Sequence, residues 1–172
     1  LDDLQAQADA GRPLAVVRIA ADEDGLARIS ETLAGQHGLT AVHVLSHGSD
    51  GVIELGRARL DSSSLQVRAG ELAAWGHALA GSADLLFYGC DVAARSDGQA
   101  LIGGLAQLTG ADVAASDDTT GALRQGGDWL LEASTGPVDA AAAISAAGQA
   151  QWQATMSLLA HDSFGNSGNL DG

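Results

Sequence analysis

The chain has 172 residues, of which 46 % are hydrophobic and only 17 % are charged, so it can fill one core of ordinary domain size. Its net charge at pH 7 is −14, because 22 acidic residues outnumber eight basic ones, all of them arginine. Such a surface repels phosphate, and we expect no nucleic-acid partner. The single cysteine excludes an internal disulfide. No apolar run reaches the ~20 residues of a membrane span, so we expect no membrane insertion by this segment.

Short hydrophobic runs alternate with helix-forming stretches in the first two thirds of the chain. Asp22 is the expected N-cap of the first helix. Strands followed by helices are typical of right-handed βαβ units. We therefore expect an α/β fold, a three-layer αβα sandwich with a mostly parallel sheet. The expected strands are residues 14–20, 40–46, 84–88 and 111–115, and the expected helices are residues 22–34 and 98–108.

Two insertions separate the second and third expected strands. Residues 52–60, with a turn at Gly56, predict a small hairpin, and residues 62–80 predict a helix. The predicted domain, residues 1–156, is completed by a strand at 129–131 and an alanine-rich helix at 140–147.

From residue 157 onward the composition shifts to Gly, Asn, Asp and Ser. This shift predicts a linker or the start of another module over residues 157–172. We expect the chain to be a segment of a longer polypeptide.

Two polar motifs follow the second and third expected strands, Ser46-His47-Gly48 and Gly89-Cys90-Asp91. The carboxyl ends of neighbouring parallel strands meet at one edge of a sheet, which places His47 and Cys90 within side-chain reach. An imidazole that takes the proton of a thiol makes it a nucleophile toward carbonyl groups. The backbone N–H groups of Gly48 and Cys90 are then the candidate donors to the oxyanion.

Five sequence motifs, in order, resemble DUF4347, a domain found near the N-terminus of very long bacterial surface and repeat proteins. The resemblance covers about residues 12–157 and implies a secreted or cell-surface location within a larger bacterial protein. The motifs are VHVLSHG (42–48), LAAWG (72–76), LFYGCDVA (86–93), LTGADVAAS (108–116) and GDW (127–129).

His-Gly and Cys on successive strands also resemble the caspase, gingipain and separase group of cysteine peptidases. That resemblance implies a caspase-like fold with His47 as the base, Cys90 as the nucleophile, and the Gly48 and Cys90 backbone as the oxyanion donors.

Two functions from different classes follow. The first is a cysteine endopeptidase that cuts its own polypeptide or a tethered partner, since a tethered bond is presented at high effective concentration. The alternative is a non-catalytic module for folding, export or display of a large adhesin, with a vestigial dyad, because free cysteines are commonly inert packing.

Ser116, Asp117 and Asp118 follow the fourth expected strand, at the same edge as the dyad, and are candidates to line the pocket for the residue before the cut bond. An acidic pocket favours Arg or Lys there. An apolar pocket would instead favour a cut near Leu158 and Leu159. We expect no required cofactor and no metal at the dyad. Calcium stays an open alternative at residues 162–166, which carry oxygen ligands but depart from the EF-hand pattern.

Overall fold

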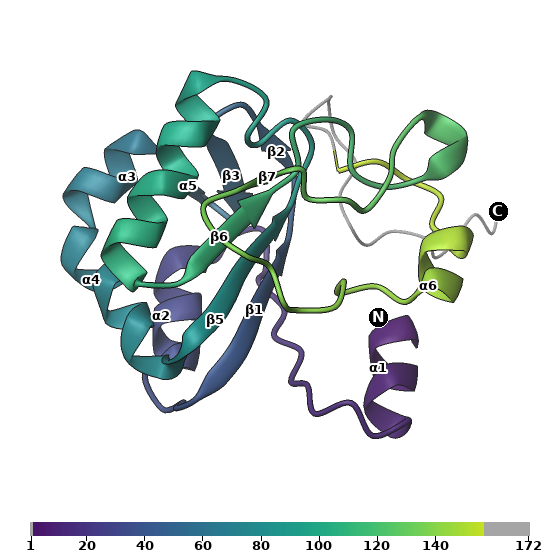
Figure 1. Ribbon diagram of the computed structural model, residues 1–172, viewed down its shortest axis with the longest axis horizontal. Coiled ribbons are helices and arrows are strands. Elements are labelled where there is room, and N and C mark those ends of the chain that lie inside the picture. The colour runs from purple at the N-terminus through teal and green to yellow at the C-terminus, as the bar shows by residue number, and fades with distance from the viewer. Residues whose placement is uncertain (1, 157–172) are drawn as a thin grey trace, which may run out of the picture.

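A computed structural model describes residues 2–156. Figure 1 shows a central sheet with a layer of helices on each side, α2 to α5 on one face and α1 and α6 on the other. Among the described helices, none is both long and apolar enough to cross a membrane. The helices are α1 (Asp2–Asp9), α2 (Gly25–Leu33), α3 (Ser62–Val67), α4 (Ala69–Trp75), α5 (Ser96–Thr109) and α6 (Ala146–Gln151), with 3-10 turns η1 (Gly76–Ala78) and η2 (Leu123–Gln125).

The main sheet has the strand order β1-β5-β6-β7, in which β1, β5 and β6 are parallel and β7 is antiparallel to β6. A separate antiparallel sheet has the order β2-β3-β4. The predicted α/β class and the mostly parallel sheet of an αβα sandwich are therefore confirmed. The strands are β1 (Leu39–Leu45), β2 (Gly48–Ser49), β3 (Val52–Leu55), β4 (Ala58–Leu60), β5 (Leu79–Tyr88), β6 (Asp112–Ala115) and β7 (Ala133–Ser134).

Strand β5 separates two hydrophobic cores. Its side chains alternate, as strand geometry requires, so Leu85 and Phe87 pack on one face and Leu86 and Tyr88 on the other. The first core is filled by α2, α4 and α5. The second core contains Trp129, Ile144, Met156 and other residues from the C-terminal third of the described chain. A strand buried on both faces reads as a continuous apolar run, which is why residues 84–88 were predictable.

Several predicted elements are confirmed with small shifts in their bounds. The strand predicted at 40–46 is β1, that at 84–88 is the end of β5, and that at 111–115 is β6. The hairpin predicted at 52–60 is formed by β3 and β4, and the helix predicted at 98–108 is α5. The helix predicted over 62–80 is instead split into α3, α4 and η1, and β5 already begins at Leu79.

The prediction of a strand at residues 14–20 is wrong, because this stretch has no regular secondary structure. The side chains of Val16 and Val17 are 45 % and 41 % exposed. Among the residues that the structure describes, β1 pairs with β5 alone in the main sheet, so residues 14–20 form no rung of that sheet. An apolar run supplies β propensity, but a strand also needs a neighbouring edge with which to pair.

The prediction of a strand at 129–131 is also wrong. Trp129 is buried and Leu130 is 65 % exposed, an alternation that resembles a strand. Residues 129–131 nevertheless form no strand, and the nearest bridge joins the preceding residue, Asp128, to Thr120. The edge strand is β7, a few residues later.

The helix predicted at 140–147 begins only at Ala146, after the N-cap Ser145. Three of the preceding backbone N–H groups donate to side chains of β5 instead. Asp84 accepts from the N–H groups of Asp139 and Ala140, and the Tyr88 hydroxyl accepts from that of Ala143. These long-range hydrogen bonds override the helix propensity of the alanines.

Helix α2 is capped by Asp24, whereas the sequence predicted Asp22 as its cap. The Asp24 carboxylate accepts the N–H of Ala27 at 3.0 Å and both oxygens accept from Arg68. These bonds hold the pKa of Asp24 below its ordinary value, and the bond from the Ala27 N–H has the largest effect. One carboxylate thus starts α2 and ties it to the helix pair α3 and α4, between which Arg68 lies.

We predict that Asp24→Ala lowers the free energy of unfolding by about 1–2 kcal/mol, the sum of a lost cap and a partly exposed ion pair. Asp22→Ala is the matched control and should change it by less than about 0.5 kcal/mol. Urea unfolding measures both variants. Equal effects would contradict the assignment of Asp24 as the cap.

His43 lies on β1, against the second core, and its ring stacks on Tyr88 with centroids 5.9 Å apart. Burial, together with the positive charge of Arg12, lowers the pKa of His43 to about 4. The unfolded chain therefore binds a proton on this residue at a higher pH than the folded chain does.

Consequently, the stability that a neutral His43 contributes should be present above pH 6.5 and be lost as the pH falls toward 4, by up to about 1.4 kcal/mol per pH unit. His43→Phe keeps a stacked ring and should flatten this part of the stability profile. His37→Gln, at an exposed histidine, should leave it unchanged. Urea unfolding between pH 7 and 4.5 tests the difference, and identical slopes for His43→Phe and the parent would refute it.

Candidate functional site

The two polar motifs lie at neighbouring strand ends. β1 and β5 are in register through the pair Leu45–Tyr88, and the next N–H along β1, that of Ser46, donates to Tyr88 O at 3.1 Å. The following residues, His47-Gly48 after the end of β1 and Gly89-Cys90 after the end of β5, leave the sheet side by side. The structure thus brings together the backbone of the two predicted motifs, at the carboxyl edge of a parallel sheet.

Gly48 allows a close approach between these two chain segments. A Cβ at this position would lie 2.5 Å from Val92 Cγ2 and 3.2 Å from the Cys90 carbonyl oxygen. His47 lies between the two sheets, half-buried, with its carbonyl oxygen accepting the N–H of Glu54 at 3.0 Å. The glycine after the histidine is therefore required by packing.

The N–H groups of Gly48 and Cys90 converge on one acceptor, the carbonyl oxygen of Met156, at 3.2 and 3.4 Å. These are the two groups that the sequence indicated as oxyanion donors. The chain turns sharply after Cys90, because Asp91 has a left-handed backbone with φ 58°. A non-glycine residue in this region is strained and is held by its surroundings; here Asp91 N–H donates to Asp118 O at 2.7 Å.

Cys90 is almost fully enclosed, with 1 % of its surface exposed. Its Sγ donates to the carbonyl oxygen of Thr120 at 3.5 Å. Burial raises the pKa of the Cys90 thiol above its ordinary value, although hydrogen bonds with Thr120 and Met156 act in the opposite direction. The thiol is therefore protonated at neutral pH in this arrangement, and it needs a base to become a nucleophile.

Residues 153–156, which we call the docked segment, lie in extended form along residues 120–122. Thr155 bridges Gly121 in antiparallel fashion. The Met156 N–H donates to Thr120 O at 3.0 Å, and the Ala122 N–H donates to Ala154 O at 2.9 Å. Figure 1 shows this end of the described chain, in yellow, approaching the carboxyl ends of the strands.

No sequence motif indicates the docked segment or Thr120, because their hydrogen bonds are main-chain and long-range. The one local signal is Gly121, whose φ is +130° and whose missing Cβ would collide with the carbonyl oxygen of Ala154. A glycine that follows Asp-Asp-Thr-Thr would be assigned to a turn on sequence grounds. The structure shows that it serves close approach of a second chain segment.

Ser116, Asp117 and Asp118 follow β6, and the carbonyl oxygens of Ser116 and Asp118 accept from the turn after Cys90. Ser116 is fully buried and its carbonyl oxygen accepts the N–H of Ala93 at 2.9 Å. Asp117 and Asp118 are exposed. Their role as a substrate pocket stays a prediction.

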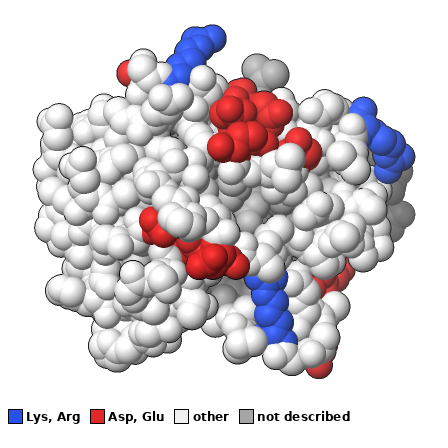
Figure 2. Space-filling model, in the orientation of Figure 1, with Lys and Arg blue, Asp and Glu red and all other residues white. Residues whose placement is uncertain are grey.

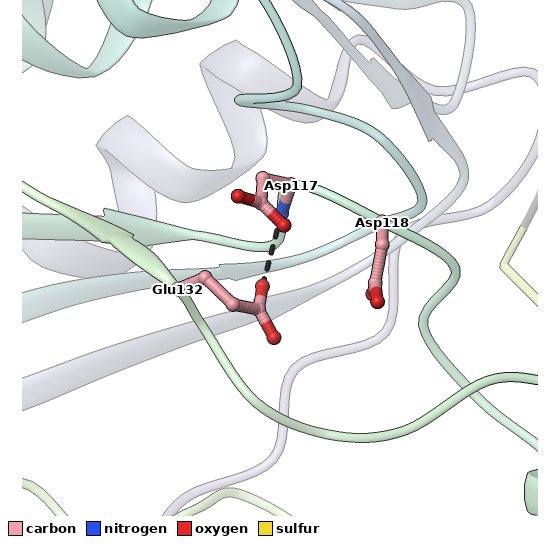
Figure 3. Close-up of side chains that lie close together, drawn as sticks. All are labelled: Asp117, Asp118 and Glu132. Atoms are coloured by element: carbon pink, nitrogen blue, oxygen red, sulfur yellow. Dashed lines mark hydrogen bonds between the residues drawn. The ribbon is translucent and has the colours of Figure 1, made fainter.

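The two aspartates form an acidic cluster with Glu132, which the sequence did not indicate. Figure 3 shows the Asp117 N–H donating to Glu132, at 3.1 Å, and Asp118 beside them. One carboxylate oxygen from each of the three lies within 4.8 Å of the others. Burial and nearby carboxylates, Asp128 first, raise the pKa of Asp118. Figure 2 shows acidic side chains gathered above the strand ends, but exposed carboxylates are common without an ion and this cluster alone assigns none.

Three predictions concern residues outside those described. The possible calcium ligands at 162–166, the candidate cut positions Leu158 and Leu159, and the linker over 157–172 all lie beyond Met156.

Comparison with known families places most of the chain in one of them. The profile of a domain of unknown function, DUF4347, matches residues 1–156. The chain therefore belongs to the DUF4347 family. Comparisons with curated proteins and with solved structures give no significant match.

We predict that iodoacetamide alkylates Cys90 at least about tenfold more slowly in the folded protein at pH 7.5 than in the same protein unfolded in urea. Enclosure blocks access and the raised pKa reduces the thiolate fraction. Mass spectrometry over time measures both rates, and the unfolded sample is the control because the chain has one cysteine. Equal rates would contradict the enclosed thiol.

Proposed function

We propose that this domain is a cysteine endopeptidase in which His47 is the base and Cys90 the nucleophile, and that it cuts its own polypeptide or a tethered partner. The observation that supports this most strongly is the convergence of the Gly48 and Cys90 N–H groups on one carbonyl oxygen. Two donors aimed at a carbonyl beside a thiol are the arrangement that stabilises a tetrahedral oxyanion. The chemistry needs neither a metal nor an organic cofactor.

In this mechanism, the thiol proton of Cys90 passes to His47 as Sγ forms a bond with the substrate carbonyl carbon. The oxygen becomes negatively charged and is stabilised by the two N–H groups. The C–N bond then breaks, the leaving nitrogen takes the proton from His47, and a thioester remains on Cys90. Water attacks the thioester, its proton passes to His47, and the C–S bond breaks to give a carboxylate and the thiol.

The raised pKa of Cys90 is compatible with this scheme. A thiol that is neutral at rest can be deprotonated during the attack by an adjacent imidazole, as in serine enzymes. From the family resemblance, we propose that the domain has a caspase-like fold and a peptide as substrate. We also propose that it is part of a large secreted or surface-displayed bacterial protein.

The same burial favours a second candidate function. A cysteine that is 1 % exposed and has a raised pKa is typical of inert packing. Under this alternative the domain is a non-catalytic module for folding, export or display of a large adhesin, and the dyad is vestigial. The two functions differ in one measurable respect, which is cleavage that depends on Cys90.

We predict that the purified 172-residue chain produces fragments on incubation at neutral pH, and that Cys90→Ala and His47→Gln abolish them. His37→Gln replaces an exposed histidine and should cleave like the parent. Intact-mass spectrometry over time detects the products. Fragments that are the same with Cys90→Ala, or no fragments from the parent, would reject the peptidase and leave the non-catalytic alternative.

A further inference from the structure

We propose that the bond cut by this site is the domain's own Met156–Ser157 peptide bond, an inference that rests on the proposed peptidase function. The docked segment would thus be the substrate in its bound position. The carbonyl group that precedes the bond is the one held by the Gly48 and Cys90 N–H groups.

The position of the Met156 carbonyl is the first support. Its two hydrogen bonds, at 3.2 and 3.4 Å, are longer than the 2.7–3.1 Å that suits a developed oxyanion. This is the expected direction, because a ground-state carbonyl oxygen is bound more weakly than the negatively charged oxygen that replaces it.

The main-chain pairing of the docked segment is the second support. Hydrogen bonds at alternate residues, from Met156 to Thr120 and from Ala122 to Ala154, are the mode by which an extended peptide adds to a strand-like edge. The Gln125 side chain extends this pairing by donating to Gln153 O at 2.7 Å. Together these contacts fix the direction and register of the segment on the site.

Thr120 links the segment to the nucleophile. Its carbonyl oxygen accepts from both the Met156 N–H and Cys90 Sγ, at 3.0 and 3.5 Å. The thiol and the backbone of Met156 are therefore positioned by one atom. Such shared positioning restricts the reacting groups before the chemical step, which is the main advantage of an intramolecular reaction.

The side chain of Met156 identifies the substrate class. It is 1 % exposed and belongs to the apolar cluster that contains Leu86, Tyr88 and Trp129. Methionine fills irregular apolar spaces well. The site therefore selects an apolar residue before the cut bond, and the exposed Asp117 and Asp118 do not set that preference.

Applied to this bond, the reaction transfers the Cys90 proton through His47 to the nitrogen of Ser157 as the C–N bond breaks. The thioester between Cys90 and Met156 is then hydrolysed by water. The products are residues 1–156 with a Met156 carboxylate and a fragment that begins with Ser157.

The mass of the fragments tests the proposal. The parent chain should give products of residues 1–156 and 157–172. Met156→Leu conserves volume and polarity and should be cut at the same bond. Met156→Asp places a charge in an apolar cluster and should reduce the cleavage rate by about 100-fold or more, since misplacement of about 1 Å has such an effect.

A milder variant guards against loss of the fold in Met156→Asp. Gln125→Ala removes one hydrogen bond at an exposed residue and should slow cleavage by about fivefold, whereas Gln36→Ala, also exposed, should not slow it. Circular dichroism and thermal unfolding verify that each variant is folded.

The outcomes separate the two proposals. Fragments that require Cys90 but map to another bond would overturn this inference and leave the peptidase standing. Fragments that do not require Cys90, or none at all, would overturn both. Equal rates for Gln125→Ala and Gln36→Ala, with Met156→Asp folded and still cut, would show that the docked segment is not the bound substrate.

Discussion

The parallel pairing of β1 with β5 is the constraint on which the rest of the site depends. Because Leu45 is in register with Tyr88, the histidine and cysteine motifs leave the sheet at the same level. β5 also carries a separate core on each face, which fixes its position against helices on one side and the C-terminal third of the described chain on the other. The backbone of Gly48 then lies so close to that of Cys90 that a Cβ on Gly48 would be 3.2 Å from the Cys90 carbonyl oxygen.

Local patterns predicted those parts of the fold in which neighbouring residues carry the information. Residues 83–88 of β5 and most of β6 are short buried runs. Helix α5 is periodic and has a glycine cap, Gly110, in the left-handed region. The predictions that are wrong concern segments whose conformation depends on residues distant in the sequence. Asp139 and Ala140 donate their N–H groups to Asp84, and Ala143 donates its N–H to Tyr88. No nearby residue in the sequence indicates these bonds. The bonds of the docked segment were unpredictable for the same reason, since main-chain pairing leaves no residue signature.

The enclosure of Cys90 is compatible with both the peptidase and the non-catalytic module. A buried thiol with a raised pKa reacts slowly with reagents in solution. Cys90 Sγ donates to the carbonyl oxygen of Thr120, and the Cys90 backbone N–H donates to that of Met156. Thr120 and the docked segment therefore both bond to Cys90, Thr120 through the thiol and Met156 through the backbone.

The covalent attachment of the docked segment to its own domain has a consequence for turnover. Hydrolysis after Met156 would remove none of the contacts that Gln153, Ala154 and Met156 N–H make with residues 120–125. The new carboxylate would keep the two N–H donors and gain a charge for them to stabilise. To bind at the site, a second chain would have to displace the docked segment, whose effective concentration is on the order of millimolar. Such an enzyme would complete a single turnover and then remain occupied by its own product.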